Sequence, residues 1–248
     1  NYNVVVGDEA GTALTTGDGN VAVGFEAIKT EDANGQNTAI GYQALTTLNA
    51  GTDAQNVAVG YQAGAAVTTG IRNVLIGGVA GDALTDADNN VAIGRAALSS
   101  DTLGSNSIAI GRNALITQNF TTATDAYNVA VGDRAGAAVT TGTSNTVIGG
   151  LTGDAITTGS SNTFLGYNSG GAESTGSNNV IVGQAGQAQT LTSDTVAVGD
   201  GALQTNTKSA KNTAIGRSAL RNLNHTTATD AYNTALGYNA GLNVTTGI

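Results

Sequence analysis

A short phrase that ends in glycine, such as "NVAVG" at 20–24, recurs along the whole chain. Successive glycines of the phrase lie 17, 17, 19, 17, 17, 17, 21, 17, 17, 17, 16, 17 and 21 residues apart, so the basic unit has 17 residues. A unit this short is below the length of helical repeats and matches one coil of a β-solenoid. The repeat therefore predicts an all-β parallel β-solenoid of about 14 coils, with 1–248 as a single repeat array. The fourteen glycines are Gly7, Gly24, Gly41, Gly60, Gly77, Gly94, Gly111, Gly132, Gly149, Gly166, Gly183, Gly199, Gly216 and Gly237.

The three residues before each glycine predict a short strand that is apolar on both faces. The first and third of them are Val, Ile, Leu or Thr in every copy, and the residue between them is Ala in most copies. Because side chains alternate along a strand, these residues divide into an aliphatic face and a smaller face. Both apolar faces of such a strand must be buried, one by its own coil and the other by something outside that coil.

Asn stands four residues before the glycine in twelve copies, with Ser107 and Thr195 as the exceptions. Asn tolerates left-handed backbone and bonds to its own backbone in turns, so the pattern predicts a corner at this position in each coil. Stacked asparagines also predict an amide ladder along the axis. A carbohydrate-binding ladder is the functional alternative for the same residues.

After the glycine, the copies divide into two types. One type has Gly at the fourth position and Val, Leu or Ile at the seventh, whereas the other has Ile or Leu at the fourth and usually a polar residue at the seventh. We interpret this as one large aliphatic side chain that fills the same interior space from two places. Glu173 breaks the pattern, because it is at the seventh position of a copy with Gly170 at the fourth. We expect Phe164 to fill the space in that copy.

Composition excludes several classes of function. Nine basic and 18 acidic residues give a formal net charge of −9, so nucleic acid and anionic membrane surfaces would be repelled. The absence of cysteine excludes disulfides, a thiolate nucleophile and a cysteine zinc site. No apolar stretch has the length of a membrane helix, so we expect no membrane insertion in this segment.

The residues offer no constellation for catalysis or metal binding. The acidic residues are scattered through predicted corners, His225 is the only histidine, and "DADNN" at 86–90 lacks the Gly and distal Glu of a calcium loop. We therefore expect no enzymatic activity, no cofactor and no metal. The threonines of the "TTG" phrases are similar to flat ice-binding arrays, but they occur in only some copies.

Three copies carry extra residues, and two of these insertions repeat the string "TTATDAYN", at 121–128 and 226–233. Extra residues in a solenoid coil leave as a loop on one side. They bring aromatic residues to places where the regular coil has none, and tyrosine is suited both to glycan stacking and to docking a neighbouring chain. His225 and Phe120 share one position of the insertions, which we interpret as exposed and replaceable. The candidate receptor or inter-chain contacts are Phe120, Tyr127, His225 and Tyr232.

A second aromatic set occupies the position directly after the glycine. Tyr, Phe, Arg and Asp all occur there, so the position is expected to be exposed. Its aromatic members are Phe25, Tyr42, Tyr61, Tyr167 and Tyr238.

The phrase "[SN]-x-A-x-G-x-x-A" is present as "NVAVGFEA", "NTAIGYQA", "NVAIGRAA" and "SIAIGRNA". It resembles the head repeats of YadA-like trimeric autotransporter adhesins and the repeat arrays of bacteriophage tail fibres. The resemblance covers essentially the whole chain. It implies a left-handed parallel β-roll in which three chains pack about a common axis, with the core aliphatic inside each coil and the small Ala face toward the partners.

We therefore expect a homotrimeric, structural and adhesive fibre segment that attaches to a host cell or surface receptor. The resemblance implies an extracellular location, on a phage virion as a tail fibre or on a bacterium as a surface adhesin, with a cell-surface glycan or protein as receptor. The chain is expected to be a fragment of a longer fibre, because both of its ends match internal parts of the repeat. The alternative is a single-chain glycan- or ice-binding β-solenoid with a self-sufficient core.

Overall fold

The computed structural model describes residues 2–190 and 192–247 and confirms an all-β parallel β-solenoid of about fourteen coils. No helix occurs among these residues. The chain divides into two compact units, Asn1–Tyr127 and Asn128–Ile248. Each unit is described by itself below.

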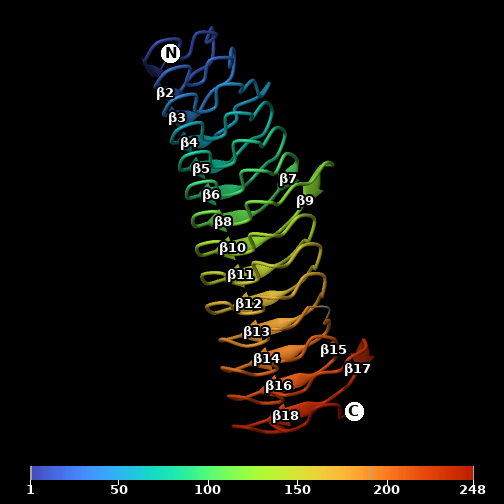
Figure 1. Cartoon of the computed structure of the whole chain (residues 1–248). Coiled ribbons are helices and arrows are strands. Elements are labelled where there is room, and N and C mark those ends of the chain that lie inside the picture. Colours follow the sequence, from blue (N-terminus) through green and yellow to red (C-terminus); the bar gives the residue numbers. More distant parts are fainter. Residues whose placement is uncertain (1, 191, 248) are drawn as a thin grey trace. The chain divides into compact units, whose positions relative to one another are not determined.

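In the first unit, the strands of the main sheet follow one another in sequence order (Figure 1). All of the pairings are parallel and in register, so that Val57, Ala58 and Val59 lie beside Val74, Leu75 and Ile76. A second, two-stranded sheet joins β7 to β9. The strands are β1 (Val4–Val6), β2 (Val21–Val23), β3 (Thr38–Ile40), β4 (Val57–Val59), β5 (Val74–Ile76), β6 (Val91–Ile93), β7 (Gly104–Ser105), β8 (Ile108–Ile110) and β9 (Thr124–Asp125).

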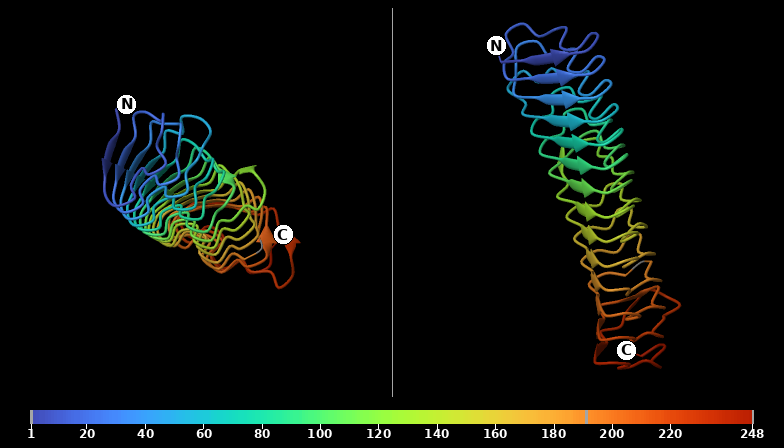
Figure 2. Two further views of the ribbon diagram at one scale, coloured as in Figure 1. Left: turned by 90° about the horizontal axis from the view of Figure 1, so that it is seen from above. Right: turned by 90° about the vertical axis from the view of Figure 1, so that its left-hand side faces the viewer.

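The second unit repeats this arrangement, with one three-residue strand in each coil and a small sheet of β15 and β17. Within each unit the strands lie one beyond another along the same side of the coils (Figure 2). The strands are β10 (Val129–Val131), β11 (Thr146–Ile148), β12 (Thr163–Leu165), β13 (Val180–Val182), β14 (Val196–Val198), β15 (Ser209–Ala210), β16 (Thr213–Ile215), β17 (Thr229–Asp230) and β18 (Thr234–Leu236).

The expected orientation of the two strand faces is wrong. The middle residue of the strand, such as Ala22, Ala58 or Leu75, is fully buried inside its own coil. The two aliphatic positions beside it are half-buried or exposed in every described strand. The middle position, which is Ala in most copies, therefore points into the coil, and the two branched aliphatic positions point outward.

The left-handed corner lies one residue earlier than the asparagine that predicted it. Residues five places before the glycine, such as Gln36 (φ 63°) and Arg72 (φ 58°), have left-handed backbone. The asparagines themselves are buried and form the predicted ladder: Asn73 N donates to Asn56 Oδ1 at 2.8 Å, and Asn90 N donates to Asn73 Oδ1 at 2.9 Å. Burial leaves this ladder no surface on which to bind carbohydrate.

The glycine that ends each strand is required by the stacking. Gly60 has φ of 143°, and a Cβ there would lie 2.5 Å from the carbonyl oxygen of Gly77 in the next coil. A side chain at this position would therefore push adjacent coils apart.

The two types of copy fill the interior as predicted. Leu45 and Leu98 at the fourth position and Val67 and Leu84 at the seventh are all fully buried. Phe164 is also fully buried, and a Cβ at Gly170 would lie 2.5 Å from Cε2 of its ring. The phenylalanine therefore occupies the space that Glu173 leaves unfilled.

Candidate functional site

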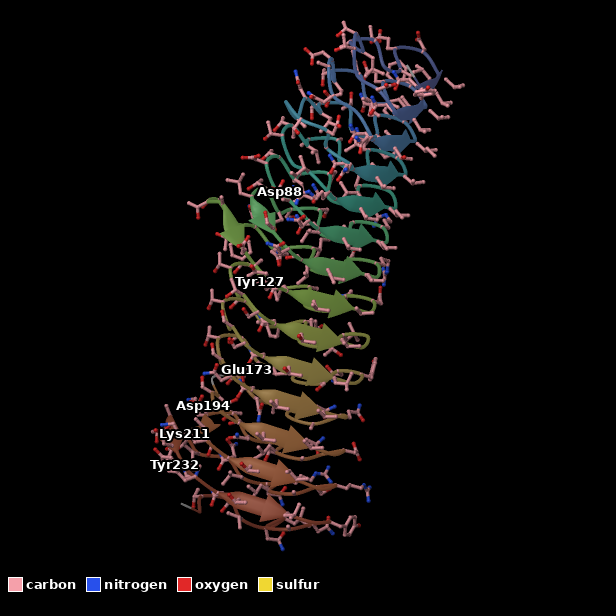
Figure 3. The ribbon with its side chains drawn as sticks, turned by 180° about the vertical axis from the view of Figure 1, so that it is seen from behind. Asp88, Tyr127, Glu173, Asp194, Lys211 and Tyr232 are labelled. Carbon is pink, nitrogen blue, oxygen red and sulfur yellow. The ribbon has the colours of Figure 1, made fainter. Side chains whose placement is uncertain are left out.

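The second long insertion forms a corner with its own small sheet. Here β15 pairs in parallel with β17, and Ser209 lies beside Thr229. Lys211 follows β15 and Tyr232 closely follows β17, and both have left-handed backbone, with φ of 60° and 53°. This backbone turns their side chains outward to the same corner (Figure 3).

Lys211, Asp230 and Tyr232 form a polar cluster at that corner. The Nζ atom of Lys211 lies 2.6 Å from Asp230 Oδ2, donates to the Tyr232 hydroxyl at 3.3 Å, and lies 5.3 Å from the centre of the Tyr232 ring. The hydrogen bonds to Asp230 and then to Tyr232 raise the pKa of the lysine above its usual value. The cluster is a stable cation held against an exposed aromatic ring.

An open cleft of about 480 Å³ lies beside this cluster. The Nζ atom of Lys208 at the cleft donates to the Thr226 carbonyl at 3.3 Å. Two of the three lysines of the chain, Lys208 and Lys211, therefore lie at one corner of a protein with a net charge of −9. The lining residues are Ser193, Lys208, Ala210, Ala228, Thr229 and Asp230.

The first long insertion has the same backbone with different partners. In this unit β7 pairs with β9, Asn106 Nδ2 donates to Asp125 Oδ1 at 2.7 Å, and the Tyr127 hydroxyl donates to Asp125 Oδ2 at 3.3 Å. Tyr127 and Tyr232 are 57% and 66% exposed, so both remain candidates for contact with another molecule.

The aspartates of the insertions link neighbouring coils, a role beyond the corners that the sequence predicted for them. Each accepts a hydrogen bond from the left-handed corner residue of the coil before it: Asp125 from Asn106, Asp230 from Lys211, and Asp53 from Gln36 Nε2 at 2.7 Å. The shared "TDA" string and the polar residue in the preceding coil were the available signal.

The expectation that Phe120 and His225 lie exposed is wrong. Phe120 is 6% exposed, and its backbone N donates to Asp101 Oδ1 at 3.0 Å. His225 is 8% exposed, and its Nε2 is buried with no hydrogen-bond partner among the described residues. Both side chains are therefore buried within the chain and are not presented at its surface.

Buried carboxylates stand at the seventh position of three copies, and their burial was not predicted from the sequence. Asp101 Oδ1 accepts from Gly104 N at 3.1 Å, and Glu31 and Glu173 make the equivalent bonds to Asn34 N and Gly176 N. Burial raises the pKa of Glu173 despite its hydrogen bonds. These groups accept backbone hydrogen bonds inside the coil and are closed to solvent.

Aromatic residues directly after the glycine form a continuous column in the first unit. Phe25 and Tyr42 stack with ring centres 5.1 Å apart, and Tyr42 and Tyr61 stack at 5.4 Å. In the second unit, the same position carries Arg217, which lies between Asp200 and Tyr238. The expected exposure is confirmed for the tyrosines: Tyr42 is 44% and Tyr61 56% exposed.

The first threonine of several "TTG" phrases uses its hydroxyl hydrogen within the solenoid. Thr68 Oγ1 donates to Thr85 O at 3.2 Å, Thr140 Oγ1 to Thr157 O at 3.1 Å, and Thr157 Oγ1 to Ser174 O at 2.9 Å. These bonds run along the axis to the next coil. These hydroxyl groups therefore link neighbouring coils, and this link is a structural explanation for the recurrence of the phrase.

Within the described part of the chain, no group of three or more His, Asp or Glu side chains is arranged to hold a metal ion. The same residues contain no helix long and apolar enough to cross a membrane. Comparison with family models, curated proteins and solved structures finds no match for this chain.

Proposed function

We propose that the chain is a non-enzymatic segment of an extracellular fibre that assembles as a homotrimer and carries adhesion to a cell surface. The observation that supports this proposal is the outer face of the strands. It presents Val, Ile, Leu and Thr from coil after coil, and Ile148 and Leu165 remain 37% and 45% exposed in a single chain. Contiguous apolar surface of this kind is characteristic of an interface with another protein.

A second copy of the chain is the partner that fits this face best. The two outer positions of the strand carry no charge in any copy, so identical faces can approach without bringing like charges together. The chain itself repeats at the coil spacing, so a second copy meets the face in register over many coils. Closed homo-oligomers are the usual outcome of such self-complementary surfaces, and three chains follow from the resemblance to trimeric fibres.

We propose adhesion because the exposed residues at the corners differ from coil to coil, whereas the repeated fold of the coils stays the same. Corner positions carry exposed aromatic and charged residues, including Tyr127 and the cluster of Lys211 and Tyr232. A phage tail fibre or a bacterial surface adhesin would present such corners to a glycan or protein receptor. The buried carboxylates and the lack of a clustered metal site among the described residues give no support to an enzyme.

Paired aspartate substitutions on the outer face test the assembly. Ile148 and Leu165 lie side by side in β11 and β12, and both are partly exposed, so the double variant I148D/L165D keeps the fold of one chain. Sedimentation velocity is expected to show a three-chain species for the unaltered protein and a single chain for the variant. The variant would bury two charges per chain at the interface, which disfavours assembly. The matched control is T141D/T158D, which adds the same charges at exposed corners of neighbouring coils and should leave the trimer intact.

The same experiment bears on the alternative, a single-chain glycan- or ice-binding solenoid. The interior of each unit is already filled by its own Ala and Leu side chains, so a lone chain does not lack a core. A stable monomer of the unaltered protein at every concentration would overturn the trimer and favour this alternative. Of these two alternatives, glycan binding has better support than ice binding, because the first threonine of several "TTG" phrases already donates its hydroxyl hydrogen to the next coil.

A further inference from the structure

The aromatic column of the first unit runs from Phe25 through Tyr42 to Tyr61. At its first end, Phe25 neighbours Glu26, whose carboxylate is paired at 2.6 Å with Lys29, and Lys29 also contacts Glu9 at 2.5 Å. At the other end, Tyr61 stacks on Tyr42 through one ring face only. The next position of the column is Gly78, which has no side chain to cover the second face.

The space beside Gly78 is free. A Cβ atom built on Gly78 would meet no atom within 4 Å, and its backbone is not in the left-handed region. The column resumes one coil later with Arg95, which is exposed. Coils of a parallel solenoid lie about 4.8 Å apart, so one missing side chain leaves a space as high as one ring.

A chain of amides runs beside the aromatic column and ends at the same coil. Gln43 Nε2 donates to Glu26 Oε2 at 2.6 Å, and Gln62 Nε2 donates to Gln43 Oε1 at 2.8 Å. The next residue of this column is Val79, which has no polar group. Gln62 Oε1 has no donor among the described residues, and Gln62 directly follows Tyr61 in the chain.

We propose that the open face of Tyr61 and the Oε1 atom of Gln62 form a binding site for a hexopyranose ring. The negative face of an aromatic ring attracts the partly positive hydrogens of an apolar sugar face, and the carbonyl oxygen accepts from one sugar hydroxyl. A flat aromatic wall with one or two placed polar groups is a common composition for a small-ligand site. The sugar takes the place of the missing ring in the column.

This inference rests on the proposed adhesive function for its role, since it gives that function a ligand class and a location. A neutral hexose also agrees with the net charge of −9, which would repel the phosphates of a nucleotide. One stacked ring and one hydrogen bond give a weak site, with a dissociation constant on the order of millimolar. Repetition of the site on three chains would raise the strength of attachment to a surface.

Saturation-transfer NMR with methyl β-D-galactopyranoside, added up to about 50 mM, tests the site. The unaltered protein is expected to transfer saturation to the ring C–H protons on one face of the sugar. The variant G78Y completes the column, so transfer should fall at least about tenfold while circular dichroism and thermal stability are kept. Y61L, which keeps an apolar side chain without a π-face, should lower transfer similarly.

G150Y is the matched control, because Gly150 occupies the same position in the second unit and its nearest neighbour is Tyr167 Cδ2 at 3.7 Å. This variant should change transfer by less than about twofold. Absence of transfer to the unaltered protein, or equal transfer in G78Y and G150Y, would overturn the inference. So would transfer that appears only in I148D/L165D, because the site would then be covered by a second copy.

The failure of this site and the failure of the proposed assembly give different results. If sedimentation finds only monomer but G78Y alone loses sugar binding, the trimer is wrong and the sugar site stands. If the trimer forms but G78Y binds the sugar as well as the unaltered protein does, the assembly stands and the site is wrong.

Discussion

At the scale of single residues, Glu173 is a carboxylate held inside the coil by three hydrogen bonds. Its Oε1 accepts from Gly176 N at 2.8 Å, and its Oε2 accepts from Thr192 Oγ1 at 2.7 Å and Thr192 N at 3.3 Å. Burial outweighs these bonds and raises the pKa above the ordinary value of 4.5. The folded chain therefore binds this proton more readily than the unfolded chain does.

The raised pKa predicts the sign of a pH effect. A carboxyl group with a higher pKa in the folded state stabilises the fold fully below pH 4.5, and this contribution is lost as the pH rises through the raised folded-state pKa. The free energy of unfolding should fall over this window in the unaltered protein and fall less in E173Q. Urea titrations at a series of pH values measure it, with D8N, an acid-to-amide change at an exposed side chain, as the control. A parallel pH dependence in the unaltered protein and E173Q would contradict the prediction.

The backbone conformation at the corners could be predicted only in part from the sequence. Asn next to a strand correctly indicated a turn and a ladder, but the left-handed backbone belongs to its neighbour, which is Gln36 in one coil and Tyr127 in another. No preference of single residues predicts tyrosine in that conformation. Its backbone is fixed by the coils on either side, which only the assembled structure contains.

At the scale of structural elements, the asparagine ladder should be a principal source of cohesion between coils. Asn73 donates from Nδ2 to Ala87 O at 2.8 Å, and its Oδ1 accepts from Asn90 N at 2.9 Å. The variant N73A would leave a buried carbonyl and a buried N–H without partners. Each costs about 1–3 kcal/mol, so the free energy of unfolding should fall by about 3 kcal/mol.

Urea denaturation followed by circular dichroism measures this loss. N49A is the control, because Asn49 is exposed and its side chain bonds to no described residue, and it should change the free energy of unfolding by less than about 0.5 kcal/mol. Equal effects of N73A and N49A would mean that the ladder does not hold the coils together. Where Ser107 replaces the asparagine of the ladder, Gln118 Nε2 donates a hydrogen bond to the serine hydroxyl at 3.1 Å.

The strands were predictable in place and length but not in orientation. The period of the repeat and the apolar triplets located every main strand, and the filling of the space at Gly170 by Phe164 followed from side-chain volume. Both strand faces are apolar, however, so hydrophobicity alone could not decide which one is inside. The folded coil decides it, because only the assembled coil shows which face packs against its other walls. The candidate site was predictable only in part, because burial also depends on the assembled coil: Tyr127 and Tyr232 are exposed, whereas His225 is buried.

At the scale of the whole molecule, the proposed trimer must overcome its own charge. Each chain has a formal net charge of −9, so three chains together have 3 × −9 = −27. The outer strand positions carry none of this charge, because they are Val, Ile, Leu or Thr in every copy. Repulsion between chains therefore comes from charged residues outside the interface. The apolar contact between the outer faces does not depend on salt screening.

Because the charges lie outside the apolar outer face, we expect salt to strengthen assembly of the trimer. The screening length falls from about 10 Å at 0.1 M salt to about 3 Å at 1 M, so repulsion between chains weakens while burial of the outer face is retained. Sedimentation equilibrium in increasing sodium chloride should show the trimer forming at lower protein concentration, by roughly tenfold across this range. I148D/L165D should stay monomeric at every salt concentration. If salt instead dissociated the trimer, ion pairs would hold the chains together, and the outer aliphatic face would not be the interface.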